Sequence, residues 1–114
     1  MRKGFILAAA AMIAAMPAAA AAQATNFTVV NDTGAGISAL SIRRTGTAEW
    51  RALSAAPGVG GSSAVNFSDP DCAFDIRASL AGGGTAEWSG VNLCGASRLT
   101  LRRRPTGETW VDYD

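Results

Sequence analysis

The chain contains no histidine, only two cysteines and a single tyrosine among its 114 residues. The absence of histidine excludes the Ser-His-Asp and Cys-His catalytic pairs and every metal site that needs an imidazole ligand. A chain of 114 residues is also too short for an α/β barrel or for a dinucleotide-binding enzyme with a separate substrate domain. The sequence therefore predicts one small domain, and it indicates destination and fold better than activity.

The N-terminus has the three-part pattern of a secretory signal peptide. Arg2 and Lys3 form a short basic start, residues 4–16 form an apolar run, and small residues follow Pro17. The run is shorter than the ~20 apolar residues that a membrane-spanning helix needs. An N-terminal membrane anchor is therefore the less favoured interpretation, and we predict export to the periplasm or to the surrounding medium.

Two A-x-A sites fit the removal of this leader, one ending at Ala22 and the other at Ala24. We assign residues 1–24 to the signal peptide and residues 25–114 to a single mature domain with no membrane span. Removing the leader leaves eight arginines and no lysine against nine acidic residues, a side-chain charge of −1. A nucleic-acid-binding protein would need a basic excess, so this balance argues against such a partner.

The two cysteines, Cys72 and Cys94, lie 22 positions apart. In an exported chain such a pair most often forms one disulfide, because the compartment is oxidising. A crosslink of this span stabilises a small domain by roughly 3–4 kcal/mol. A redox or metal-binding thiol pair is the alternative, but the chain has no C-x-x-C motif. Cys72 falls on the apolar face of a predicted strand, so its partner should come from across the core.

The apolar residues of the mature chain recur with a period of two rather than 3.6, which is typical of half-buried strands. Residues 72–80 alternate most clearly, and Asp75 and Arg77 share the predicted solvent face. Turn signals rich in Gly, Pro, Asn and Asp separate the runs. About seven or eight short strands predict an all-β fold, a small antiparallel β-sandwich or partly open barrel. The predicted strands are residues 27–30, 37–44, 49–53, 64–67, 72–80, 98–104 and 109–113.

Two features interrupt this pattern. Val91 and Leu93 share a face while Cys94 points the other way, so we expect a bulge or bend in residues 91–94. The string Gly46–Trp50 (GTAEW) recurs as Gly84–Trp88, 38 residues later. The echo indicates either a duplicated unit of strand, Gly-rich turn and Trp-bearing strand, or a coincidence in an alanine-rich chain.

The arginines Arg98, Arg102 and Arg104 are the strongest candidate binding residues. Leu99 and Leu101 alternate with them, so burial of the leucines would turn these guanidinium groups outward together. Such a stripe could bind an anionic envelope component or a protein partner. The alternative is a solvated strand face that discourages edge pairing.

Two other groups of side chains are weaker candidates. The tryptophans could form a platform for stacking sugars, although burial in the core is the commoner role of such rings. Three neighbouring aspartates could ligate calcium, but they match no EF-hand loop, and nothing marks any of them as a general acid. We therefore predict no catalytic residue, metal or cofactor. The tryptophans are Trp50, Trp88 and Trp110, and the aspartates are Asp69, Asp71 and Asp75.

Three segments together resemble a group of small exported proteobacterial proteins that have no established function. They are FTVVNDTG at residues 27–34, CAFDIR at 72–77 and WSGVNLC at 88–94. The resemblance covers about residues 27–101 and implies a signal peptide, one disulfide and a β-rich domain, with no catalytic residues. Such chains sometimes carry the name argininosuccinate lyase, a large helical tetramer that a short, histidine-free, β-patterned chain cannot form.

The sequence thus favours a periplasmic or secreted, non-catalytic binding or envelope-associated module. A small hydrolase that uses carboxylates and arginines is one alternative, and a pocket lined by Asp or Glu would favour it. A secreted enzyme inhibitor is another, and a protruding rigid loop near the disulfide would favour that.

Overall fold

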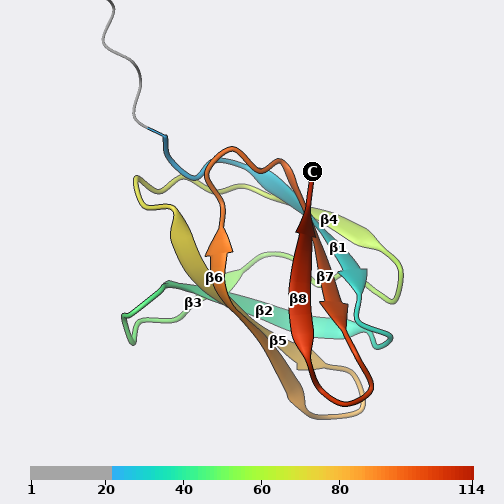
Figure 1. The fold of residues 1–114 in the computed structure, drawn as a ribbon. Coiled ribbons are helices and arrows are strands. Elements are labelled where there is room, and N and C mark those ends of the chain that lie inside the picture. Colours follow the sequence, from blue (N-terminus) through green and yellow to red (C-terminus); the bar gives the residue numbers. More distant parts are fainter. Residues whose placement is uncertain (1–21) are drawn as a thin grey trace, which may run out of the picture.

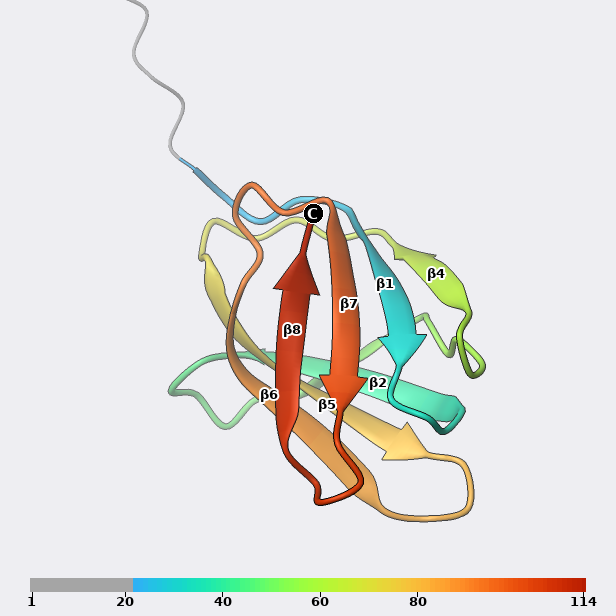
Figure 2. The ribbon, with the colours of Figure 1, turned by 45° about the vertical axis from the view of Figure 1, so that its right-hand side comes forward.

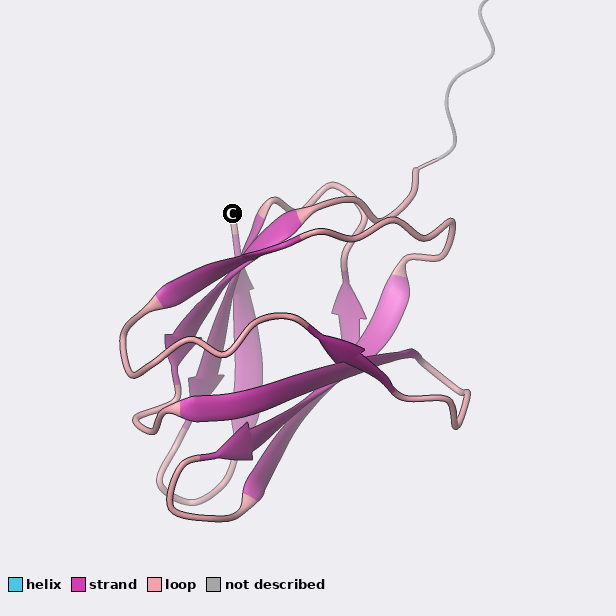
Figure 3. Cartoon of the chain, turned by 180° about the vertical axis from the view of Figure 1, so that it is seen from behind, coloured by secondary structure: helices cyan, strands magenta, loops and turns pink. Residues whose placement is uncertain are grey.

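The computed structural model describes residues 22–114. The predicted leader is therefore outside the described residues except for its last three positions. Figure 3 shows strands joined by loops, and the described part of the chain contains no helix. It follows that no described helix is long and apolar enough to cross a membrane.

Eight strands form two four-stranded sheets that pack face to face (Figure 1). The first sheet has the order β4-β1-β7-β8, and the second has the order β3-β2-β5-β6. The predicted all-β sandwich is confirmed, and the partly open barrel is not the architecture found. The strands are β1 (Phe27–Asp32), β2 (Ile37–Arg44), β3 (Arg51–Leu53), β4 (Ser62–Val65), β5 (Ala73–Leu80), β6 (Thr85–Asn92), β7 (Arg98–Arg103) and β8 (Thr109–Tyr113).

One strand pairing departs from the antiparallel arrangement that we expected. β1 and β7 run parallel, with Thr28 opposite Arg98 and Asp32 opposite Arg102. Figure 2 shows the two strands side by side with β8 and β4 at the edges. A parallel pair needs a long connection, and the whole second sheet together with β4 lies between β1 and β7 in the chain. Alternation along one strand cannot reveal this direction, because it is the same in both kinds of pair.

The core lies between the sheets and is built from the inward positions of the alternating strands. Trp88 and Phe74 are its largest fully buried side chains. The Trp88 indole Nε1 donates a hydrogen bond of 3.0 Å to the Arg102 carbonyl oxygen in the other sheet. Thr109 Oγ1 donates to the Glu87 carbonyl oxygen at 2.7 Å, which ties β8 to β6. Buried polar groups thus join the two sheets along one side of the sandwich.

Strand β6 has no counterpart among the seven predicted runs, because a bulge breaks its alternation. Ile76 of β5 lies opposite Trp88, whereas Phe74 lies opposite Val91, so β6 carries an extra residue between them. Gly90 takes up the bulge with a φ of 63°, in the left-handed region that favours glycine. We expected this irregularity in residues 91–94, and it lies one position earlier.

The GTAEW echo falls in two hairpins of one sheet, but their registers differ. Ser41 lies opposite Ala52 in the first hairpin, and Ser79 lies opposite Thr85 in the second. A shift of 38 residues would place Gly90 opposite Ser79 instead. The pairings therefore give no support to a duplicated unit.

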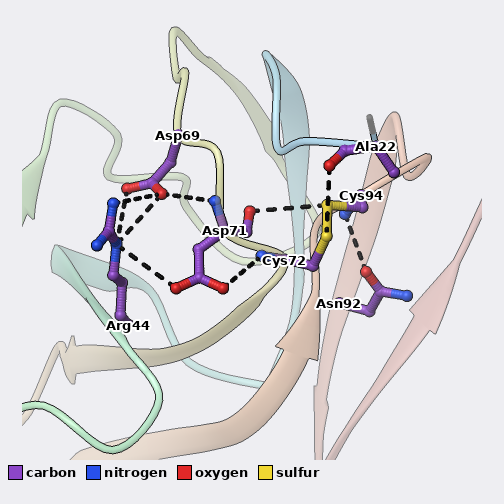
Figure 4. Close-up of a disulfide and its surroundings, with 7 residues drawn as sticks. All are labelled: Ala22, Arg44, Asp69, Asp71, Cys72, Asn92 and Cys94. Carbon is purple, nitrogen blue, oxygen red and sulfur yellow. Dashed lines mark hydrogen bonds and ion pairs between the residues drawn. A yellow bond between two sulfur atoms is a disulfide. The ribbon is translucent and has the colours of Figure 1, made fainter. Parts of the chain in front are cut away.

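The predicted disulfide between Cys72 and Cys94 is confirmed, with a Cα–Cα distance of 5.1 Å. The expectation that it crosses the core is wrong. Cys72 precedes β5 and is only half-buried, and Cys94 follows the neighbouring strand β6. The Leu93 amide donates to the Cys72 carbonyl oxygen at 2.9 Å, so the bridge staples two adjacent segments at one end of the sandwich (Figure 4).

Candidate ligand-binding site

The outer face of the β4-β1-β7-β8 sheet carries the predicted arginines. Leu99 and Leu101 are fully buried, which turns Arg98 and Arg102 outward on the same face of β7, as predicted. Arg104 lies just beyond the strand end, where its Nε is 2.9 Å from Glu108 Oε1 across the following turn. The structure therefore brings two of the three arginines onto one strand face and places the third at the turn.

Arg102 does not stand alone on this face. Its guanidinium pairs with Asp32 of β1 and with Asp112 of β8. The hydrogen bond to Asp112 and the charges of both carboxylates raise the pKa of Arg102. These partners could not be predicted from the sequence, because they come from the neighbouring strands of the sheet. The middle of the predicted stripe thus has two carboxylates for one guanidinium and carries no positive excess.

A cleft of about 460 Å³ opens on this face beside the ends of β1 and β7 and the start of β8. Asp32, Arg102, Arg103 and Trp110 are among its lining residues. Trp110 is 38% exposed, one of three large hydrophobic residues that the described structure leaves exposed. The Arg104 guanidinium carbon lies 4.9 Å from the centre of its ring, within the range of a cation–π contact.

Arg103, which lines the cleft, differs from its two neighbours in the chain. It is half-buried, and among residues 22–114 it makes no ion pair, whereas Arg102 and Arg104 each have carboxylate partners. Sequence reasoning missed Arg103 as a candidate because it alternates with the outward arginines. The cleft therefore combines an exposed indole, a guanidinium that has no ion pair among residues 22–114 and the exposed carboxylate of Asp32.

The outer face of the second sheet corrects another expectation. Asp75, predicted on the solvent face, is only 3% exposed. Arg43 Nε donates to its Oδ2 at 2.9 Å, while Thr45 Oγ1 and the Gly90 amide donate to Oδ1 at 2.8 and 3.0 Å. Burial by itself would raise the pKa of Asp75, but these hydrogen bonds and the Arg43 charge outweigh it and lower the pKa.

The tryptophans do not form a common platform. Trp88 is in the core, Trp110 is exposed, and Trp50 is half-buried under two arginines. The guanidinium carbons of Arg43 and Arg77 lie 4.4 and 4.0 Å from the centre of the Trp50 ring. The two guanidinium groups cover the surface of the Trp50 ring on which a sugar would have to stack.

A second buried carboxylate lies near the disulfide (Figure 4). Asp69 Oδ1 accepts hydrogen bonds from Arg44 Nη2 at 2.9 Å and from the Asp71 amide at 2.8 Å. Arg51 Nη2 lies 3.4 Å from Asp69 Oδ2. Burial alone would raise the pKa of Asp69, but the Asp71 amide and the two arginines outweigh it and lower the pKa.

The three aspartates weighed for calcium are engaged by arginines: Asp75 pairs with Arg43, whereas Asp69 and Asp71 both pair with Arg44. Within the described residues, no three His, Cys, Asp or Glu side chains gather as metal ligands. Arg43 beside Asp75 and Arg44 beside Asp69 supply the positive charge that a metal ion would otherwise supply to these carboxylates.

The fold and the cleft together define a small, disulfide-stapled β-sandwich domain with one mixed polar and aromatic surface site. Among solved structures, the chain is similar to the NMR structure of a protein from Eubacterium rectale, with a TM-score of 0.56 and 15% identity over 79% of this chain and 87% of the other. At this identity the likeness shows the fold alone. No family model matches the chain, and no curated protein matches it.

Proposed function

We propose that this protein is a non-catalytic binding module of the cell envelope, periplasmic or secreted, whose ligand is an anionic envelope component. The disulfide supports export, because such bonds persist in oxidising compartments. The observation that carries the binding role is the shared outward orientation of Arg98 and Arg102, next to an exposed Trp110 that Arg104 contacts.

The charge states of the buried acids favour binding over hydrolysis. A hydrolase that works with carboxylates needs one whose pKa is raised, so that it can donate a proton. Asp69 and Asp75 are the two buried carboxylates of the described chain, and the pKa of each is lowered. Asp32, the carboxylate of the cleft, is paired with Arg102.

Binding to the arginine face should be weak and sensitive to salt. The mature chain is nearly neutral, so the attraction comes from local charge that is screened over about 8 Å at physiological ionic strength. We would titrate the mature, oxidised protein with anionic vesicles, lipopolysaccharide and an acidic polysaccharide at several salt concentrations. Binding should appear at low salt and disappear as salt is added.

Two variants test the residues. Replacing Arg98, Arg102 and Arg104 together by Ser should remove this binding. Replacing only Arg98 and Arg104 by Ser leaves the ion pairs of Arg102 with Asp32 and Asp112 intact. Arg77→Ser is the matched control, because Arg77 is an exposed arginine on the opposite sheet. Circular dichroism verifies folding. Absence of binding at low salt, or equal loss in the control, would refute the proposal.

A further inference from the structure

The cleft beside Trp110 has the components of a sugar site. Its volume of about 460 Å³ falls in the range of about 300–1,000 Å³ that is typical of small-molecule sites. An exposed indole offers an apolar surface on which the C–H face of a sugar ring can pack. Trp110 lines the cleft and is 38% exposed, so a ligand would pack on the part of the ring that the Arg104 guanidinium does not cover.

The polar residues of the wall indicate the chemistry of such a ring. Arg103 is half-buried without an ion pair in the described structure, and a guanidinium forms a strong two-point pair with a carboxylate or a phosphate. Asp32 pairs with Arg102 through Oδ2 only, so its Oδ1 can accept a hydrogen bond from a sugar hydroxyl. Arg102 is shared between Asp32 and Asp112, so Arg103 is the arginine of the cleft wall that has no ion pair among residues 22–114 and could take the negative group of a ligand.

We propose that this cleft binds an acidic sugar unit, with the ring packed on Trp110, the negative group on Arg103 and a hydroxyl on Asp32. This inference rests on the proposed function and deepens it, since it names the anionic ligand as an acidic glycan. A carboxylate and a phosphate share the chemistry that Arg103 would recognise, and the test separates them.

The test is an NMR titration of the mature, oxidised protein with three probes. They are tri-galacturonic acid, its fully methyl-esterified form and glucose 6-phosphate. The acidic trimer should shift the Trp110 indole signal and leave that of Trp50 in place, and the neutral ester should bind about tenfold more weakly. A shift with glucose 6-phosphate alone would assign a phosphate-bearing sugar, and no Trp110 shift with any probe would overturn the proposal.

Two variants separate the ring contact from the charge contact. Trp110→Ala should weaken binding of the acid and of the ester by the same factor, about tenfold. Arg103→Gln should weaken only the acid, so the ratio of the two affinities should approach one. If Trp110→Ala leaves the titration unchanged while the arginine variants abolish vesicle binding, the proposed function stands and the sugar site fails.

A separate observation concerns the start of the mature chain. Ala24 is fully buried in the core. Its amide donates to the Asp69 carbonyl oxygen at 2.9 Å, and its carbonyl oxygen accepts from the Asp69 amide at 3.1 Å. It also forms an isolated β-bridge with Cys94 next to the disulfide. Cleavage after Ala24 would remove a residue that belongs to the fold.

We infer that the leader is cleaved between Ala22 and Gln23. Both residues are exposed, and the preceding A-x-A site ends at Ala22. The domain would then begin at Gln23, two residues before the boundary that the sequence predicted. The new N-terminal glutamine can cyclise: its α-nitrogen bonds to the side-chain amide carbon, the C–N bond of that amide breaks, and ammonia leaves.

Intact-mass measurement of the exported protein tests this cleavage. We expect the mass of residues 23–114 with one disulfide and with ammonia lost, and a chain that begins at Thr25 would overturn the inference. As a second measurement, residues 23–114 and 25–114 are each refolded and melted. The shorter chain should have the lower Tm, and equal Tm values would remove the physical basis of the inference.

Discussion

At the scale of single residues, the main finding is that an aspartate predicted in solvent is instead buried and paired. Alternation correctly put Asp75 on the outer face of β5, but it could not show that Arg43 and the Gly90 bulge cover that position. The cost of burying this carboxylate is offset because Arg43, Thr45 and the Gly90 amide donate hydrogen bonds to it.

Replacing Asp75 by Ala should lower the free energy of unfolding by about 2–4 kcal/mol. The change leaves the Gly90 amide and Thr45 hydroxyl without an acceptor and leaves Arg43 without its nearest carboxylate. Asp75→Asn keeps an oxygen acceptor and should cost less. Urea denaturation of both variants measures the difference, and a loss below about 1 kcal/mol for Ala would contradict the account.

The buried carboxylates also set the response to acid. The pKa values of Asp69 and Asp75 in the folded protein lie below the ordinary value of 3.8. Their contribution to stability is therefore fully present above about pH 4 and is lost as pH falls through the folded pKa values. The urea concentration at the midpoint of unfolding, measured at a series of pH values from 6 downward, should decrease once the pH is below 4. Asp75→Asn should flatten that fall, and Glu49→Gln, an exposed acid without an ion pair in the described structure, serves as control.

At the scale of elements, the register of β6 depends on one glycine. Gly90 absorbs the extra residue of the bulge and aims its amide at Asp75, so the strand regains its inward phase at Val91. A period-two reading across this point fails, since a bulge reverses which residues face the core. This is why the sequence indicates β6 only through the repeated GTAEW string that ends at Trp88.

Gly90→Ala should destabilise the fold by about 1 kcal/mol, because an L-residue is strained in the left-handed region. A Cβ at Gly90 meets no atom within 4 Å, so strain and not collision is the cause. Gly58→Ala is the matched control: it also has open space, and its φ is outside the left-handed region. Thermal melts compare the two, and equal Tm values would contradict the assignment of the bulge.

At the scale of the whole molecule, the disulfide fastens one end of a small sandwich. It joins the segments beside β5 and β6, and the Ala24 segment that leads into the other sheet bridges to Cys94. The bridge thus restrains the end of the sandwich at which the chain enters the fold. The cleft lies at the other end.

Replacing both Cys72 and Cys94 by Ala should lower the free energy of unfolding by roughly 2–5 kcal/mol. The physical reason is the larger conformational freedom that the unfolded chain regains when a loop of 22 residues is opened. Denaturant titration of the oxidised protein and the variant gives the value. Thiol titration of the native protein should detect no free cysteine, and two reactive thiols would contradict the bridge.

Local sequence signals predict the class of the fold, the approximate positions of seven strands and the cysteine pairing, although the strand predicted at 64–67 is found at Ser62–Val65. These follow from alternation along 72–80, turn residues between the runs, and two cysteines in a chain with a predicted leader. The outward arginines also follow locally, since Leu99 and Leu101 must be buried.

Which charged side chains pair with one another depends on how the strands are arranged in the folded protein. The parallel pairing of β1 with β7 puts Asp32 beside Arg102, and the bulge in β6 puts a backbone amide on Asp75. The cleft likewise needs residues from β1, β7 and β8 at one end of the sheet. Such contacts join positions up to 70 residues apart, and a one-dimensional pattern carries no information about strand order or direction.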